Sequence, residues 1–179
     1  MSAALSVHRI LTESMVPMLQ SLSAIFDKAS VFAETKKIDP TVLASARLAP
    51  DMFPLTRQVQ IACDMLKSAA AYLAGAEPQR FEDNEKTLEE LKARIAKCIA
   101  YVESFPASAY DGAESRKIVM PLIDKLVLDI DGAHYLTDWT IPHFYFHVAT
   151  AYDILRHNGL DVGKRDYLAH VGKFIQERG

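Results

Sequence analysis

The stretch IPHFYFHVATAYDILRHNGLDVGKRDYL, residues 141–168, decides the fold, because it predicts a long amphipathic helix with a defined end. Its apolar face comprises Phe144, Val148, Ala151 and Leu155. Pro142 suits the first position of that helix. Arg156 and His157 favour the negative end of the helix dipole, and Gly159 supplies the left-handed residue at which helices commonly stop. The segment is therefore expected to form the last long helix of a helical bundle.

Three other segments carry the same periodicity, so the sequence predicts an all-α fold with four long helices. These segments comprise residues 11–32, residues 53–73 and about residues 83–105. Pro17 lies inside the first segment, where it removes a backbone hydrogen bond and is expected to bend the helix or mark its start. A single domain over residues 1–179 is the simplest interpretation of this pattern.

Shorter elements are predicted between the long helices. The Asp-Pro pair at residues 39–40 begins a short helix that is expected to end near Pro50. The runs KIVMPL (residues 117–122) and KLVLDI (residues 125–130) predict a minor β-hairpin between the third and fourth long helices, lying across the end or flank of the bundle. Asp161 is expected to cap a last helix that continues to about Ile175.

Composition excludes several classes of protein. Half of the 179 residues are apolar, the formal net charge is −3, and Lys and Arg are dispersed, so no nucleic acid partner is expected. No apolar run approaches the ~18 residues of a membrane span, and the N-terminus lacks the pattern of a signal peptide. Cys63 and Cys98 fall within helical patterns without a cationic neighbour and are expected to be reduced, unligated thiols. We therefore predict a cytoplasmic protein with no membrane partner.

The candidate site residues are His143 and His147, which project from one face of the last long helix about 6 Å apart. His147 lies about 60° and His143 about 100° from the centre of the apolar face, so His147 is expected to face inward. It is predicted to act as a ligand-binding or proton-transfer group, or to be a partly buried histidine bonded to a neighbouring helix. Gln58 lies near the apolar seam of the second long helix and completes the candidate ligand-binding set.

A metal site would need a third inward ligand. Arg57, Gln60 and Asp64 form a stripe opposite the apolar seam, so Asp64 is expected to be a solvated carboxylate. Extending the first seam backwards reaches His8, a possible third ligand close to the chain terminus. We therefore predict no metal and no cofactor.

Other polar and aromatic residues fit packing roles. His134, Trp139 and Tyr145 are expected to pack or to lie in an interface rather than to hold a cofactor. The sequence contains no glycine-rich nucleotide loop, no hydrolase GxSxG elbow, no CxxC and no HExxH.

The runs IDPTVLASARLAPDMFPLTRQVQIACD (residues 38–64) and HFYFHVATAYDILRHNGLDVGKRDYL (residues 143–168) resemble a bacterial family catalogued as domain of unknown function nineteen ninety-three. The resemblance covers nearly the whole chain. That family is in turn distantly similar to the DinB and YfiT-like helical bundles. This resemblance implies a four-helix core of up-down-down-up type and frequent dimerisation. Many DinB-like proteins hold a divalent metal with one histidine on the second bundle helix and a His-x-x-x-His pair on the last. His143 and His147 match that pair, whereas residues 53–73 contain no histidine.

Two functions follow as hypotheses. The favoured one is a non-enzymatic module that binds a small-molecule ligand in its interior or acts as a dimeric interaction module, and we expect a homodimer. The alternative is a DinB-like transferase or isomerase, dependent on a metal or a thiol, that uses the pair His143 and His147.

Overall fold

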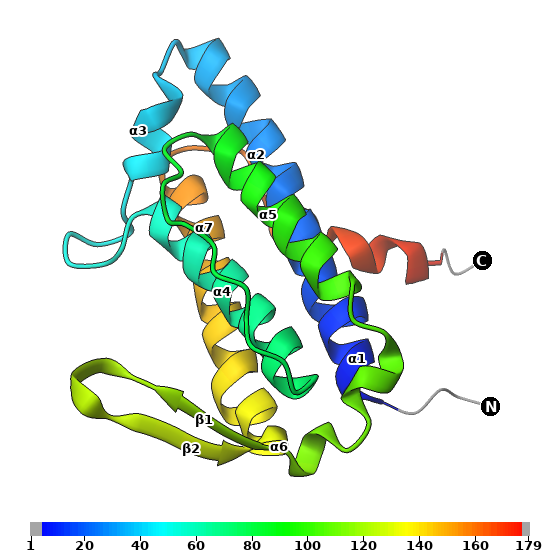
Figure 1. Ribbon diagram of the computed structural model, residues 1–179. Coiled ribbons are helices and arrows are strands. Elements are labelled where there is room, and N and C mark those ends of the chain that lie inside the picture. The colour runs from blue at the N-terminus through cyan, green and yellow to red at the C-terminus, as the bar shows by residue number, and fades with distance from the viewer. Residues whose placement is uncertain (1–4, 177–179) are drawn as a thin grey trace.

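In the computed structural model, residues 5–176 are described, and four long helical rods form a bundle (Figure 1). The rods are α1 (Val7–Arg9) continued by α2 (Val16–Lys36), then α4 (Leu55–Leu73), α5 (Leu88–Glu103), and α6 (Gly132–His134) continued by α7 (Ile141–His157). The other elements are α3 (Pro40–Ser45), α8 (Lys164–Tyr167), the strands β1 (Lys117–Pro121) and β2 (Val127–Asp131), and short 3-10 turns at Ala107–Tyr110, Ala113–Ser115, Ile123–Lys125 and Ala169–Phe174. The predicted all-α bundle with one minor hairpin is confirmed. The ends of the predicted domain, residues 1–4 and 177–179, lie outside the described residues.

The first and last rods each contain one wide turn directly before a proline. Ile10–Met15 forms a π-helical turn ahead of Pro17, and Tyr135–Thr140 forms another ahead of Pro142. Proline has no backbone N–H to donate, and its ring crowds the preceding turn. The wider turn makes room for the ring and tolerates the missing hydrogen bond, so neither rod is interrupted there. The last rod therefore begins at Gly132, ten residues before the predicted start at Pro142, with the carboxylate of Asp131 accepting from the backbone N–H of His134.

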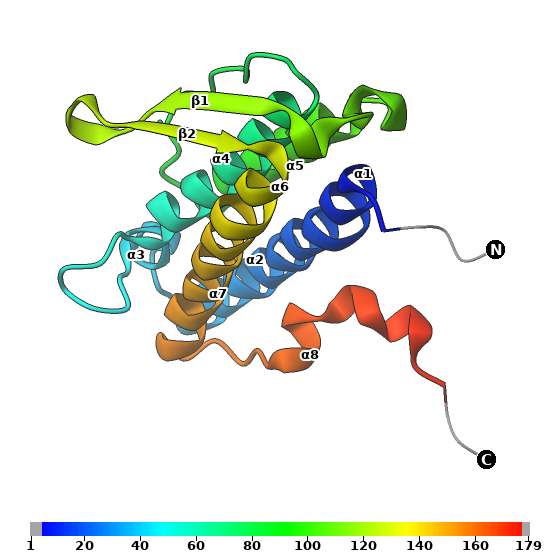
Figure 2. The ribbon, with the colours of Figure 1, turned by 90° about the horizontal axis from the view of Figure 1, so that it is seen from below.

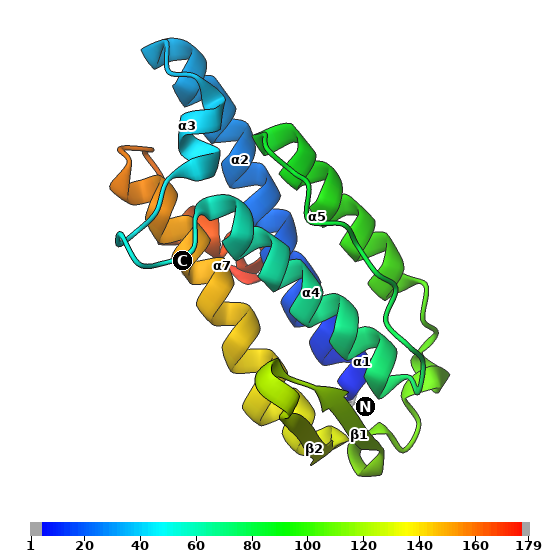
Figure 3. The same cartoon turned by 60° about the vertical axis from the view of Figure 1, so that its left-hand side comes forward.

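The central rod of the bundle is α4, which packs against α7 and α5, while α2 contacts both of those helices from the opposite side (Figure 3). The core is built from the apolar seams predicted from the sequence. Its largest fully buried side chains include Tyr135, Phe26, Phe144, Leu22 and Leu66. Each such side chain contributes about 1.5–3 kcal/mol by leaving water, which outweighs the weak intrinsic helix preference of these segments.

The predicted hairpin pairs β1 with β2 in antiparallel register, with Ile118 opposite Ile130. It crosses the end of the bundle near α4 and α6, and its tip extends beyond the helices (Figure 2). Ile118 is buried, whereas Asp124 and Lys125 form the tip with left-handed backbone conformations, φ 57° and 69°. The hairpin is thus anchored at its base and forms an arm on one flank of the bundle.

The third rod begins five residues later than predicted. Thr87 is the N-cap of α5 and forms a capping box with Glu90, whose carboxylate accepts from the backbone N–H groups of Lys86 and Thr87. The preceding segment, residues 77–87, is extended and is called the strap below. The capping box stops the helix at Leu88 and leaves the strap free to pack on the surface of α4 and α5.

Two further predicted helix ends differ from the structure. The helix α3 ends at Ser45 rather than near Pro50, because Ala46 turns to an extended conformation with ψ 148°. The last helix begins later and ends earlier than predicted: Gly163 rather than Asp161 is its N-cap, with the carboxylate of Asp166 accepting from the Gly163 N–H, and the chain passes into the 3-10 turn Ala169–Phe174 after Tyr167. The stop of α7 is confirmed: Gly159 has φ 92°, and the N–H of Leu160 donates to the carbonyl of Leu155. Over residues 5–176, no helix has the length and apolar character needed to cross a membrane.

Candidate functional site

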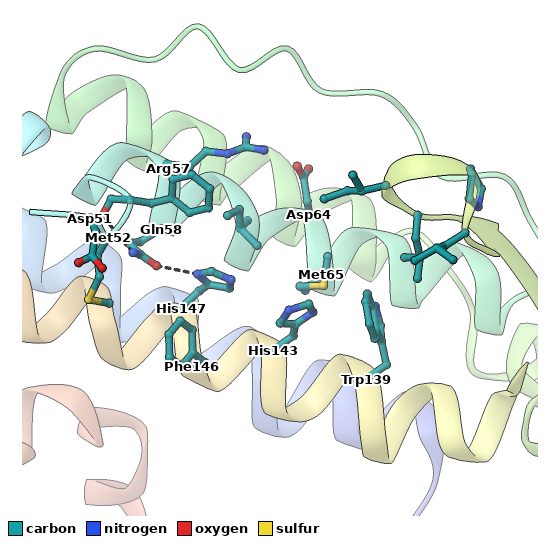
Figure 4. Close-up of a pocket in the computed structure, with 16 residues that line it drawn as sticks. Asp51, Met52, Arg57, Gln58, Asp64, Met65, Trp139, His143, Phe146 and His147 are labelled. Carbon is teal, nitrogen blue, oxygen red and sulfur yellow. Dashed lines mark hydrogen bonds between the residues drawn. The ribbon is translucent and has the colours of Figure 1, made fainter. Parts of the chain in front are cut away.

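A groove of about 1150 Å³ lies between α4, α7 and the hairpin arm (Figure 4). Most of its wall is apolar, as is common for small-molecule sites. The apolar lining residues are Met52, Phe53, Ile61, Met65, Pro121, Leu122, Ile123, Leu126, Trp139 and Phe146. The polar lining residues are Asp51, Arg57, Gln58, Asp64, His143 and His147, so all three candidate residues named from the sequence contribute to one cavity.

His147 and Gln58 form a buried hydrogen bond in the groove. The Nδ1 atom of His147 lies 2.6 Å from Oε1 of Gln58, and both residues are more than nine-tenths buried. The Gln58 amide is oriented by its other end, because Nε2 donates to the carbonyl oxygen of Phe53 at 3.1 Å. The carbonyl oxygen of this amide therefore faces the ring, and Nδ1 of His147 carries the proton that is donated.

Burial lowers the pKa of His147 to about 4, with further contributions from the positive charges that His143 and Arg57 can carry. The imidazole is therefore neutral near pH 7, and its unprotonated nitrogen is Nε2. Nε2 has no hydrogen-bond partner among the described residues, and it is not sealed from solvent. It is therefore a hydrogen-bond acceptor open to the groove.

His143 lies beside His147, one helical turn earlier and half-buried. Its ring centre is 5.7 Å from that of His147 and 4.7 Å from that of Trp139, which it meets edge to face. The Nδ1 atom of His143 and the Nε1 atom of Trp139 are both buried without a hydrogen-bond partner in the described part of the chain. Trp139, which was predicted only to pack or to form an interface, thus contributes to the groove wall.

Two of the charged residues at the groove rim, Arg57 and Asp64, are bonded to groups outside the groove. Arg57 pairs with Asp83 of the strap and donates to Gln60. Asp64 accepts from Lys67 at 2.8 Å and from Arg94 at 3.1 Å. The prediction that Asp64 is a solvated carboxylate holds only in part: its side chain is 28% exposed but paired with two cations, because the strap covers part of the stripe that contains it, and Gln60 of the same stripe is buried.

Arg94 joins the strap to α4 and α5. The Arg94 side chain is 1% exposed. Its guanidinium nitrogens lie 3.1 Å from a carboxylate oxygen of Asp64 and 2.9 Å from those of Asp83 and Glu85. The guanidinium also donates to the carbonyl oxygen of Glu82 at 2.9 Å. Phe81 of the strap also packs beneath this cation. Glu90 takes part in the capping box of α5, whereas Arg94 points inward toward the strap.

Comparisons with known proteins agree with this architecture. The model of a family described as "Domain of unknown function (DUF1993)" matches residues 7–168. The chain belongs to the DUF1993 family. A crystal structure described as a DinB family member protein from Shewanella denitrificans is similar to it, with 43% sequence identity, a TM-score of 0.83 and 90% of each chain covered. A search of curated proteins found no match.

DinB-like bundles are associated with a divalent metal, but the described residues of this DUF1993 chain do not fit a site with three protein ligands. Over residues 5–176, no cluster brings together three His, Cys, Asp or Glu side chains able to hold a metal ion. Gln58 faces His147 from α4 and binds the Nδ1 edge of that ring. A tight zinc site usually has three or more protein ligands, and His143 and His147 provide two. The absence of a stoichiometric metal stays a prediction.

His8, Tyr145 and His134 lie outside the groove. His8, the possible third ligand, lies against Tyr110 with ring centres 5.9 Å apart and lines a separate small cavity, so it does not complete a site with His143 and His147. The hydroxyl of Tyr145 lies 2.9 Å from that of Ser14. His134 pairs with Asp131 at 2.7 Å on the surface. Tyr145 packs against the core as expected, whereas His134 is exposed and forms a surface ion pair instead of packing.

The two thiols of this DUF1993 chain are fully buried and not joined by a disulfide, and the Cys98 Sγ donates to the carbonyl oxygen of Cys63 at 3.3 Å. The contact with Cys98 and burial raise the pKa of the Cys63 thiol, and they outweigh the opposite effect of Arg94. The expectation that no cation lies near these thiols is therefore wrong, although its consequence is unchanged. We expect a thiol reagent to label both cysteines slowly in the native protein and rapidly after unfolding. Fast native labelling of both would contradict this.

Replacing His147 with alanine should lower the free energy of unfolding by about 1–3 kcal/mol, because Gln58 Oε1 would lose its partner inside the protein. The matched His143→Ala change should have a smaller effect, since no hydrogen bond of the described structure depends on that ring. Urea denaturation of both variants is the measurement. Equal and negligible losses would place both rings in solvent and contradict the structure.

Proposed function

We propose that this DUF1993 protein is a non-enzymatic binding module whose groove takes a small molecule with a mainly apolar body. The observation that carries the proposal is the neutral, Gln58-bonded imidazole of His147 exposed to a groove with apolar walls. A cavity of about 1150 Å³ is large enough for a drug-sized molecule. Its few polar groups lie together on facing sides of α4 and α7, where they can orient a ligand.

A DinB-like enzyme is the second candidate, supported by the closeness of the two imidazole rings, 5.7 Å between centres. A general base works best when its pKa lies near the operating pH. Because burial lowers the pKa of His147 to about 4, this ring is a weak base near pH 7. That shift favours binding over proton transfer, and metal analysis of the purified protein would test the metal-dependent form of the enzyme hypothesis.

The binding proposal can be tested with N-phenyl-1-naphthylamine, an uncharged probe whose emission rises in apolar sites. Trp139 is the only tryptophan of the chain and lines the groove, so its own emission reports occupation of this site. We expect saturable binding in which the probe emission rises while the Trp139 emission is quenched.

Two variants make this test specific. Phe146→Glu places a charge in the groove wall and should weaken probe binding at least about tenfold, since the carboxylate would lose water when the probe binds. Val31→Glu on α2 is the control, because Val31 is outside the groove and similarly exposed, 62% against 55% for Phe146. Probe binding that leaves Trp139 emission unchanged, or equal effects of the two variants, would refute the proposal.

A homodimer and a cytoplasmic location are the remaining parts of the proposal. The exposed apolar side chains on the hairpin arm, such as Ile123 and Leu126, offer one surface that a second copy could cover. Light scattering on the purified protein tests the oligomeric state, and cell fractionation tests the location.

A further inference from the structure

We propose that the ligand of the groove is an uncharged molecule with a flat apolar body and one hydroxyl group, and that this hydroxyl donates a hydrogen bond to Nε2 of His147. The inference rests on the proposed binding function and specifies the chemical class of the ligand. It depends on the orientation of one hydrogen bond, on the bonding of the charged groups around the groove, and on the shape of its walls.

The hydrogen bonds around Gln58 fix which ring nitrogen is available. Gln58 donates through Nε2 to the Phe53 carbonyl, so its Oε1 must accept from Nδ1 of His147. The neutral ring then presents a lone pair at Nε2, and Figure 4 shows the edge opposite Gln58 turned toward His143 and the open groove. A lone pair selects a donor on the ligand, and a hydroxyl is the smallest uncharged group that provides one.

The charged groups at the rim do not favour an anionic ligand. The cation Arg57 is paired with Asp83, and the carboxylate of Asp64 is paired with Lys67 and Arg94. Asp51 is exposed to solvent at one end of the groove. An anion would therefore enter without an available cationic partner and would meet Asp51, so it would lose hydration without compensation.

The walls indicate the shape of the ligand body. Phe146 on α7 and Trp139 on the π-helical turn before α7 lie on either side of the two histidines, and Met65 faces them from α4 (Figure 4). Aromatic rings and a thioether pack well against the faces and edges of a flat ring system. A bicyclic aromatic alcohol fits this chemistry.

The test compares four probes on the wild-type protein: 2-naphthol, 2-methoxynaphthalene, naphthalene and 2-naphthoate. Dissociation constants are measured by calorimetry and by Trp139 emission, in buffer containing a chelator. We expect 2-naphthol to bind about tenfold more tightly than its methyl ether or naphthalene, as one hydrogen bond to a buried acceptor would provide, and 2-naphthoate to bind most weakly.

Two variants locate the hydroxyl. His147→Phe should remove the advantage of 2-naphthol while naphthalene still binds, and His157→Phe, an exposed position on the same helix outside the groove, should leave all four constants unchanged. Since the first variant strands Gln58, its folding is checked by circular dichroism, and the wild-type probe series decides the question alone if the variant does not fold.

The outcomes separate this inference from the proposed function. Equal binding of 2-naphthol and its methyl ether would overturn the hydroxyl contact but leave a functional binding groove. Tightest binding of 2-naphthoate, or binding of 2-naphthol that requires metal to be restored, would overturn the ligand class. Failure of all four probes, together with failure of N-phenyl-1-naphthylamine, would refute the binding function itself.

Discussion

Replacing Arg94 with methionine should lower the free energy of unfolding by about 3 kcal/mol. The variant removes a buried cation that contacts Asp64, Asp83 and Glu85, so three carboxylates would lose their shared partner while remaining close together. Breaking such an ion pair by removing the buried partner is strongly destabilising, because the remaining carboxylates are partly withdrawn from water, Glu85 most of all with a side chain 11% exposed. Urea denaturation followed by circular dichroism measures the loss.

The control for this prediction lies on the same helix. Lys92→Met removes an exposed pair with Asp27, whose side chains are 35% and 63% exposed, and should change stability by less than about 1 kcal/mol. Hydrogen exchange should also show that the strap opens before the bundle unfolds in the Arg94 variant. Equal stability losses in the two variants, or a strap that stays protected, would contradict the role assigned to Arg94.

Gly132→Ala should also lower the free energy of unfolding by about 3 kcal/mol. Gly132 is buried at the first position of the last rod, and a Cβ there would overlap the backbone oxygen of Ala113 and lie 2.9 Å from its carbonyl carbon. Backbone atoms cannot swing away as a flexible side chain can, so the rod or the turn at Ala113 must move. Thermal unfolding measures the effect, and Trp139 emission reports whether the groove shifts with the rod.

Gly172→Ala is the matched control. A Cβ at Gly172 meets no atom within 4 Å, so this variant should be within about 0.5 kcal/mol of the wild type. If both glycine variants unfold at the wild-type temperature, the close approach of Gly132 to Ala113 is incorrect.

The sequence predicted those parts of the fold that depend on periodicity. The seams of the four rods, the short hairpin and the Gly159 stop follow from the spacing of apolar residues and from local backbone preferences. The start of the last rod differs from the prediction. A proline is typical of the first helical position, so Pro142 predicts a start there, whereas a π-helical turn at Tyr135–Thr140 continues the rod from Gly132 past Pro142. Rules about single residues do not reveal a wide turn that compensates for a proline.

The candidate site could be predicted only in part. The inward direction of His147 follows from its place on the helical wheel, and Gln58 follows from its place beside the seam of α4. The strap was not foreseen, because residues 83–87 were assigned to a helix, and a polar stripe was therefore expected to face water. The acidic residues Asp83 and Glu85 before the capping signal at Thr87 were the available indication that an extended segment pairs with Arg94.

The hairpin arm has two unpaired edges, since the described residues contain a sheet of two strands. Such edges are templates on which strands from other molecules can add, and apolar side chains such as Ile123 increase that tendency. Lys117 and Asp129 form an ion pair across the strands, and Pro121 removes one backbone donor from β1. These residues oppose edge-to-edge pairing, so they make it harder for a strand of another molecule to add to the arm that carries the apolar side chains beside the groove.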